Sequence, residues 1–265
     1  MTGVASARLD GRHAAGPRLL TVAWALGGAG VLTQMVFPFT SGGTTALTVL
    51  SVVLLAVASL THAAATRGPR TALAVLLVAG GGGLLAETVG VHTGVPFGDY
   101  AYTGTLGPQL LGVPAIVPLA WAMLAYPALL VARTLVGSRP ALVVPLAAWA
   151  LATWDVFLDP QMVDAGHWRW AHPTPALPGV TGIPLTNYIG WLLVAVLLAA
   201  LLDRVVPAVA APDALPHALY AWTYLSSVLA HAVFFGRPPV ALVGGLLMGT
   251  VAVPLLVALA RRRTP

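Results

Sequence analysis

The sequence predicts an all-α fold, a polytopic membrane helix bundle with about eight transmembrane helices. Of its 265 residues, 58% are hydrophobic and only 8% are charged, and the mean hydropathy is +0.88. A soluble domain averages about 45–50% apolar and about 25% charged residues, so this composition excludes a soluble globular protein. It also excludes a disordered chain, because disordered chains are poor in apolar residues. Apolar runs long enough to cross a bilayer, roughly 20 residues each, follow one another along most of the chain.

We expect a single membrane domain over residues 1–265, with a cytoplasmic N-terminal tail over 1–18. The eight expected spans cover 19–37, 45–65, 71–91, 112–136, 140–158, 184–202, 214–235 and 240–260. The first run is longer than the apolar core of a signal peptide, which has about 7–15 residues, and it lacks a convincing small-residue cleavage site. It is therefore expected to remain as an uncleaved span.

The glycine and proline residues of the later spans are compatible with transmembrane helices. Pro114, Pro118 and Pro127 are expected to bend the fourth span, and neighbouring helices in a bundle satisfy the backbone groups that proline frees. Gly245 and Gly249 form a G-x-x-x-G pair in the last span. This spacing lets two helices approach closely in lipid, so we interpret it as helix packing.

The arginines predict the orientation of the bundle. With the N-terminus inside, eleven of the thirteen basic residues fall on the cytoplasmic side, namely Arg8, Arg12, Arg18, Arg67, Arg70, Arg133, Arg139, Arg204, Arg261, Arg262 and Arg263. Arg169 and Arg237 fall outside. This positive-inside bias predicts cytoplasmic termini and a multi-pass protein of the cytoplasmic (plasma) membrane. Because the arginines flank spans instead of forming a patch on a soluble surface, no nucleic-acid partner is expected.

Acidic residues gather on the opposite, outer side. They are Glu87, Asp99, Asp155, Asp159 and Asp164, and they accompany two long outer connections, 92–111 and 159–183. Long polar connections on rigid spans are where functional sites usually lie. The outer side is therefore the expected location of a site.

Three of these carboxyl groups lie at membrane depth, where an ionisable group is expensive and is a functional candidate by default. Glu87 lies near the end of the third span, with no basic neighbour in sequence. Asp155 and Asp159 are four residues apart and share one helix face. Such a pair favours one protonated carboxyl, because two like charges cannot both be accommodated there. The structural alternatives are a carboxyl hydrogen-bonded to another span for Glu87, and a simple turn before Pro160 for Asp159.

Aromatic and amide side chains are predicted at the same level. Asp99 is followed by Tyr100 and Tyr102, and the sixth span opens with Asn187, Tyr188 and Trp191. Asn187 and Trp191 share a helix face. An interfacial aromatic belt would account for Trp168 and Trp170. It accounts less well for Trp121, which lies deeper.

No metal or cofactor is expected. The chain has no cysteine, which excludes thiolate metal sites, iron–sulfur clusters and disulfides. Its seven histidines lack the i, i+3 or i, i+4 clusters of a helix-borne metal site. Glu87, His92 and His231 are the least improbable ligands, and His231 is equally explained as a packing residue.

Several motifs of the outer half occur together. They are Glu87 with Gly90; Gly94-Val95-Pro96-Phe97-Gly98-Asp99-Tyr100-Ala101-Tyr102; Gly112-Val113-Pro114 with Trp121; Asp155-Val156-Phe157-Leu158-Asp159-Pro160; Trp168-Arg169-Trp170; and Gly182-Ile183-Pro184-Leu185-Thr186-Asn187-Tyr188-Ile189-Gly190-Trp191. This set resembles the integral-membrane carotenoid biosynthesis proteins, whose characterised members are carotenoid 1,2-hydratases and bisanhydrobacterioruberin hydratases. The specific resemblance covers roughly residues 87–121 and 154–191.

The resemblance implies a cofactor-independent hydro-lyase that adds water to the terminal C=C bond of an acyclic carotenoid, with bacterioruberin as one possible product class. Its partners would be a lipophilic carotenoid substrate, the lipid bilayer and, as one possibility, other enzymes of the carotenoid pathway. Hydration of such an alkene requires a proton donor, a water and a base. In this hypothesis Asp155 or Glu87 donates the proton, and Asp99 or Asp159 positions the water. The end-group pocket would be formed by Tyr100, Tyr102, Trp121, Asn187, Tyr188 and Trp191.

Three alternatives belong to other classes. A membrane lycopene cyclase also protonates an alkene, but its product keeps the mass of its substrate. A prenyltransferase would need aspartate-rich clusters that bind diphosphate through magnesium, and one aspartate pair falls short of this. A proton-coupled transporter would use the buried acids as a relay, although the sequence has no evident inverted repeat.

Overall fold

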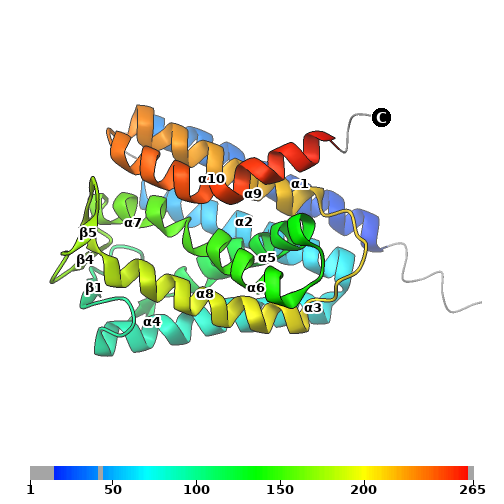
Figure 1. Cartoon of the computed structure of the whole chain (residues 1–265), viewed down its shortest axis with the longest axis horizontal. Coiled ribbons are helices and arrows are strands. Elements are labelled where there is room, and N and C mark those ends of the chain that lie inside the picture. Colours follow the sequence, from blue (N-terminus) through cyan, green and yellow to red (C-terminus); the bar gives the residue numbers. More distant parts are fainter. Residues whose placement is uncertain (1–14, 41–43, 262–265) are drawn as a thin grey trace, which may run out of the picture.

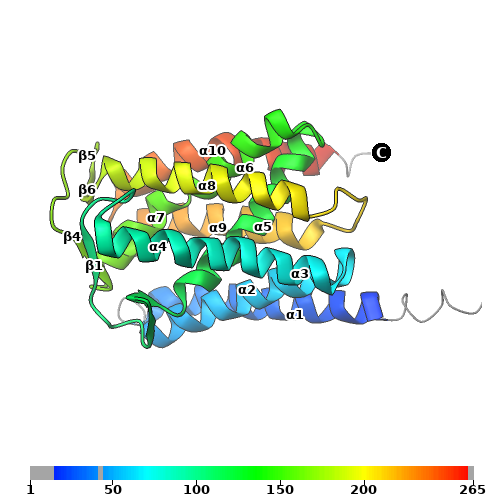
Figure 2. The same cartoon turned by 90° about the horizontal axis from the view of Figure 1, so that it is seen from below.

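A computed structural model describes residues 15–40 and 44–261. Its helices lie side by side along one long axis, and Figures 1 and 2 show the same arrangement from two directions. Most of the predicted tail and the arginines at positions 8, 12, 262 and 263 lie outside the described residues. The two described ends, at the start of α1 and the end of α10, lie at the same end of the bundle (Figure 1).

The helices follow the predicted order of spans. They are α1 Ala15–Val36, α2 Thr45–Arg67, α3 Pro69–Val75, α4 Gly82–Thr93, α5 Val117–Val136, α6 Pro140–Ala152, α7 Asp155–Asp164, α8 Leu185–Val205, α9 Ala214–Leu229 and α10 Pro238–Arg261. A 3-10 turn, η1 (Phe37–Phe39), extends α1. Two π-helical segments extend other helices: η2 (Leu76–Gly81) joins α3 to α4, and η3 (Ala230–Phe234) extends α9.

Seven helical rods in the described part of the chain are long and apolar enough to cross a membrane. The rod formed by α9 and η3 is not among them. The chain is therefore a polytopic helical membrane protein, as predicted.

Two predicted span boundaries are wrong. The fourth span begins at Val117 instead of residue 112, because Val113–Pro114 pairs as strand β3 with Gln109–Leu110, strand β2. The fifth span does not end at residue 158 but continues through Pro160 to Asp164, after a break between α6 and α7. Pro160 removes one backbone hydrogen bond, but burial of the apolar side chains around it keeps α7 helical.

We call the end of the bundle away from the two described chain ends the outer end, and the opposite end the inner end (Figure 1). The outer end carries short strands that a purely all-α prediction omits. β1 (Tyr100–Tyr102) pairs antiparallel with β4 (Trp168–Trp170), and β5 (Ala176–Leu177) pairs with β6 (Val180–Pro184). In both β1 and β4 the aromatic residues alternate with another residue. This period of two puts both aromatic side chains of each strand on one face of the small sheet.

Glycine ends helices at both ends of the bundle. Gly68 follows α2 at φ +93°, and Gly94 follows α4 in the left-handed region at φ +73°. Residues with a side chain rarely adopt these angles. Gly94 lets the chain leave α4 and return over the bundle as β1.

α5 lies at the centre of the bundle. An unbroken stretch of buried side chains runs from Trp121 to Ala132 on it, and it packs against α2, α6, α8 and α9. Helices with a wholly apolar, buried surface occupy the interior of a membrane bundle. The outer end of α5 therefore reaches the candidate site from inside.

Candidate functional site

A cavity of about 70 Å³ lies at the outer end of the bundle. Helices α2, α4, α5, α7 and α8 and the β1–β4 sheet contribute its walls. Its polar and aromatic wall residues are Thr48, Glu87, Phe97, Tyr100, Tyr102, Trp121, Trp154, Asp159, Trp168, Trp170, Asn187 and Trp191. We call it the outer chamber.

Glu87 projects from α4 into this chamber, and its side chain is only 5% exposed. Tyr100 Oη and Tyr102 Oη both donate hydrogen bonds to its Oε2, the second at 2.9 Å. Trp121 Nε1 donates to its Oε1 at 3.2 Å. Three neutral donors thus hold this carboxyl group in one orientation.

The two tyrosines of β1 remain donors over a wide pH range. Burial raises the pKa of Tyr100 and of Tyr102 above the ordinary tyrosine value, and the neighbouring Glu87 carboxyl raises both further. Burial acts this way because it disfavours the charged phenolate. Both phenols are therefore hydrogen-bond donors at neutral pH.

Asp155 and Asp159 lie on adjacent turns of α7 and meet at one amide. Asn187 Nδ2 of α8 donates to Asp155 Oδ2 at 2.7 Å, and the same nitrogen donates to Asp159 Oδ2. Trp168 Nε1 of β4 donates to Asp159 Oδ1 at 3.1 Å. Asp155 is fully buried behind the chamber wall, whereas Asp159 lines the chamber.

The β1–β4 sheet connects the two acidic groups. Tyr100 lies opposite Trp170 in its register, and Tyr102 lies opposite Trp168. Its β1 side thus contacts Glu87 and its β4 side contacts Asp159. The sheet covers the chamber and orients both carboxyl groups.

The apolar walls of the chamber are aromatic faces. The rings of Trp121 and Trp191 stack with centroids 4.0 Å apart and 12° between their planes, and Trp154 meets Trp191 edge to face. A side chain at Gly83 would collide with Trp121, because a Cβ at this position would lie 2.5 Å from that indole ring. The glycine of α4 therefore makes room for the tryptophan that contacts Glu87.

The three chamber carboxyls receive only uncharged donors from residues 15–40 and 44–261. Phenol, indole and amide groups supply every hydrogen bond that the structure describes for them. The nearby Arg237 instead pairs with Asp164 at the surface. This arrangement places three carboxyl groups inside an apolar bundle without a cationic partner among the described residues.

A metal site finds no support among the residues described. No group of three or more histidine, cysteine, aspartate and glutamate side chains is placed to hold an ion there. His92 is exposed and contacts Thr88 O, and His231 contacts Phe157 O at 3.0 Å. The three least improbable ligands, Glu87, His92 and His231, are thus engaged separately.

Most predicted site residues come together, and two do not. Glu87, Asp159, Tyr100, Tyr102, Trp121, Asn187 and Trp191 line the chamber, and Asp155 joins it through Asn187. Asp99, in the loop before β1, is exposed and does not line the chamber, so the structure does not bring it together with the other three acids. Tyr188 is half-buried outside the chamber wall, and its hydroxyl has no hydrogen-bond partner among the described residues.

Sequence reasoning missed four aromatic wall residues: Phe97, Trp154, Trp168 and Trp170. The two tryptophans of β4 were expected in an interfacial belt, but both are buried and both indole nitrogens are hydrogen-bonded inside the protein. The Trp-Arg-Trp alternation was the available signal, because it predicts a strand with one buried face.

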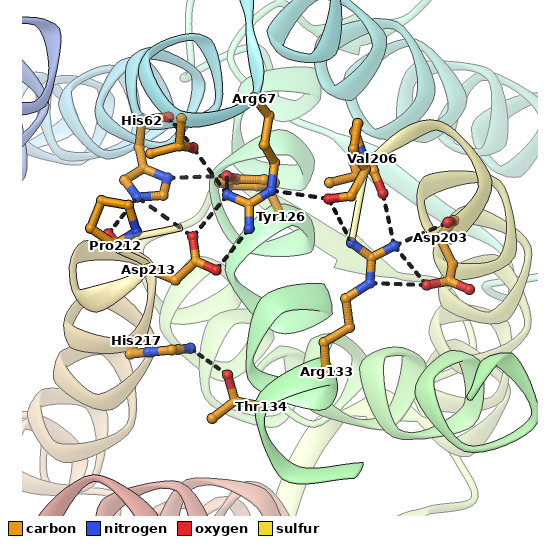
Figure 3. A network of polar contacts seen from close by, with 12 residues as sticks. His62, Arg67, Tyr126, Arg133, Thr134, Asp203, Val206, Pro212, Asp213 and His217 are labelled. Atoms are coloured by element: carbon orange, nitrogen blue, oxygen red, sulfur yellow. Dashed lines mark hydrogen bonds and ion pairs between the residues drawn. The ribbon is translucent and has the colours of Figure 1, made fainter. Parts of the chain in front are cut away.

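A second polar cluster lies at the inner end of the bundle (Figure 3). Arg67 donates to both oxygens of Asp213, at 2.8 and 2.7 Å, and Arg133 pairs with Asp203 at 2.8 Å. Tyr126 accepts from Arg67 at 2.9 Å. We call this the inner network. Its carboxylates are neutralised by arginines, so it ties α2, α5, α8 and the start of α9 together.

Comparison with known proteins identifies similar sequences. The family described as "Carotenoid biosynthesis protein" has a model that matches residues 43–260. A bisanhydrobacterioruberin hydratase of Haloarcula japonica is 41% identical over 119 residues, which are 42% of this chain and 39% of that relative. The matched part thus spans well under half of the relative. No solved structure matches the chain.

Proposed function

We propose that this chain, which belongs to the carotenoid biosynthesis protein family, adds water across the terminal C=C bond of an acyclic carotenoid end group. The observation that carries this proposal is the outer chamber. It combines stacked tryptophan faces with carboxyl groups that no arginine in the described part of the chain neutralises. Similarity to a hydratase over part of the chain supports the same reaction.

The Asp155–Asp159 pair is the proton source in this proposal. Two carboxyl groups that share one amide repel each other when both are ionised, so the pair retains a proton. Asp159 faces the chamber and can deliver this proton to the terminal alkene carbon. A C–H bond forms there, the C=C π bond breaks, and a tertiary carbocation results.

Glu87 and the indole faces then act on the cation. The three hydrogen-bond donors hold Glu87 in one orientation, and in this proposal it carries the negative charge that stabilises the developing positive charge. Trp121 and Trp191 offer aromatic faces for the same purpose. A water molecule attacks the cation, and Glu87 accepts the proton that this water loses.

The reaction balances without a redox change. The substrate gains one water, and the proton taken up by Glu87 returns to the aspartate pair before the next turnover. Acid–base chemistry suffices for these steps, so a redox cofactor is not needed. The product is a tertiary alcohol.

The membrane topology is a further part of the proposal. We take α9 with η3 as the eighth crossing, because an even number of crossings leaves both described ends on one side, as in Figure 1. The arginine-rich inner end would face the cytoplasm of the plasma membrane. A reporter fused after Pro265 should then read cytoplasmic, and one inserted after Gly104 should read external.

Pigment analysis tests the proposed reaction directly. The chain is expressed in a host that accumulates lycopene or its C50 elongation product, and extracts are separated with mass detection. A more polar pigment, heavier by one or two waters, is expected. An isomer of unchanged mass would instead indicate cyclisation, and unchanged pigments with the protein in the membrane would refute hydration of these end groups.

The variant Glu87→Gln links that product to the chamber. It removes the carboxylate while keeping the size of the side chain, so we expect normal membrane levels and little or no hydrated product. Full conversion by this variant would eliminate Glu87 from the mechanism.

A further inference from the structure

A second hollow, of about 470 Å³, lies beside the outer chamber. It runs between α1 with η1, α2, α7 and α9 with η3. Its wall is largely apolar and aromatic, with Met35, Met123, Phe157, Leu225 and Leu229 among its residues. Its volume falls within the range of ligand pockets, about 300–1,000 Å³. We call it the lateral groove.

The lateral groove adjoins the outer chamber. Five side chains line both spaces: Thr48, Val52, Trp154, Leu158 and Met162. These shared side chains form a common wall between the chamber and the groove. The remaining sides of the chamber are covered by the β1–β4 sheet and by α4, α5 and α8.

The far side of the groove reaches the surface of the bundle. There Phe37 meets Phe235 edge to face, and Phe39 meets Phe234 in the same way, between η1 and η3. Phe39 is 74% exposed and Phe234 is 44% exposed. Exposed aromatic rings at this edge of a membrane bundle would contact lipid, so the edge of the groove is apolar.

We propose that the lateral groove binds the polyene chain of the substrate while its end group occupies the outer chamber. This inference rests on the proposed function. A chamber of about 70 Å³ holds only an end group, so the chain attached to it must leave through a neighbouring apolar space. The groove is that space, because it shares a wall with the chamber and has an apolar edge that would contact the lipid in which the substrate dissolves.

A small residue on the groove wall provides the test. Ser226 of α9 lines the groove but not the chamber, whereas Ala218 on the same helix is exposed at the bundle surface and lines neither. Protein is purified from the carotenoid-accumulating host, and its bound pigment is measured by visible absorbance per protein. Ser226→Trp should lower bound pigment at least tenfold, and Ala218→Trp should leave it within twofold of the parent chain.

A second pair of variants repeats the test on another helix. Val52→Trp fills the wall between groove and chamber, and Leu50→Trp adds the same side chain on the exposed side of α2. The former should lose pigment and the latter should keep it. Equal pigment in both members of both pairs would overturn the inference. It would favour a membrane lipid as the occupant of the groove instead.

Two readouts separate this inference from the proposed reaction. Bound pigment reports on the groove, whereas product mass reports on hydration. Glu87→Gln should keep its pigment while losing the hydrated product. A parent chain that binds pigment in the groove but never changes its mass would refute hydration and retain the polyene site.

Discussion

Carboxyl groups lie at both ends of the bundle, partly exposed at the inner end and buried at the outer end, and they have different partners. At the inner end, Asp213 and Asp203 are each paired with an arginine at 2.7–2.8 Å. At the outer end, Glu87, Asp155 and Asp159 receive hydrogen bonds from phenol, indole and amide groups. A neutralised carboxylate holds helices together, whereas one without a cation retains its capacity to exchange a proton or to stabilise a cation.

The sharpest test of this comparison is Asp159→Asn. It removes the acid that faces the outer chamber and keeps nearly the same shape, so turnover should fall about 10³-fold, within the usual range for loss of a general acid. Hydrated pigment is measured per amount of folded protein.

The matched control lies on the same helix. Asp164 ends α7 and pairs with Arg237 at the surface, so Asp164→Asn should retain turnover within about twofold, as ordinary surface substitutions do. Equal losses in both variants would contradict the comparison, because turnover would then depend on acidic side chains of α7 whether or not they line the chamber.

At the inner end, the expected effect is on stability. Arg67→Ala removes the arginine partner of Asp213, and because the pair is only partly buried the cost should be at most about 3 kcal/mol, the lower end of the range for fully buried pairs. Thermal unfolding in detergent should show the loss, while turnover per folded molecule should be unchanged. The double change Arg67→Met with Asp213→Leu should recover much of the stability, because both charges are then removed together. A loss of turnover in stable protein would place the inner network in the mechanism.

The sequence predicted the helices well because each span satisfies a local rule of length and hydropathy. It also predicted that Asp155 and Asp159 share a face, since their i, i+4 spacing determines this. It did not predict which acids meet across helices. Asn187 joins the aspartate pair through contacts between α7 and α8, and no local pattern encodes such a contact.

The outer strands were missed for a similar reason. β1 and β4 have three residues each and are separated by more than 60 residues along the chain, so their pairing depends on the bundle between them. The sequence grouped Asp99 with the other acids, but Asp99 ends the loop before β1 and its side chain is exposed. Tyr100 turns inward to Glu87, while Asp99 remains at the surface. The glycine at position 83 was assigned no role, yet it makes room for Trp121.

Removal of one tyrosine hydroxyl at each end of the bundle is a finer test of the comparison. Tyr102→Phe removes one of the three donors on Glu87, and a hydrogen bond to a charged group contributes about 1.5–3 kcal/mol. Turnover should therefore fall by about ten- to a hundredfold. The same change at the inner end, Tyr126→Phe, removes a contact of Arg67 and should leave turnover unchanged. A similar fall in both variants would mean that the two networks are coupled.

The smallest expected effect is on the alkaline limb of the pH profile. Ionisation of Tyr100 or Tyr102 would abolish donation to Glu87, and an unperturbed tyrosine ionises near pH 10. Burial raises the pKa of both groups, so ionisation moves to higher pH and the donors persist throughout the neutral and mildly alkaline range. Turnover in detergent should change less than about twofold between pH 7 and 9 on their account. The profile of Tyr102→Phe should run parallel to that of the parent chain. An alkaline loss that disappears in Tyr102→Phe would show that this phenol ionises early, and the chamber would then have to be far wetter than its buried tyrosines indicate.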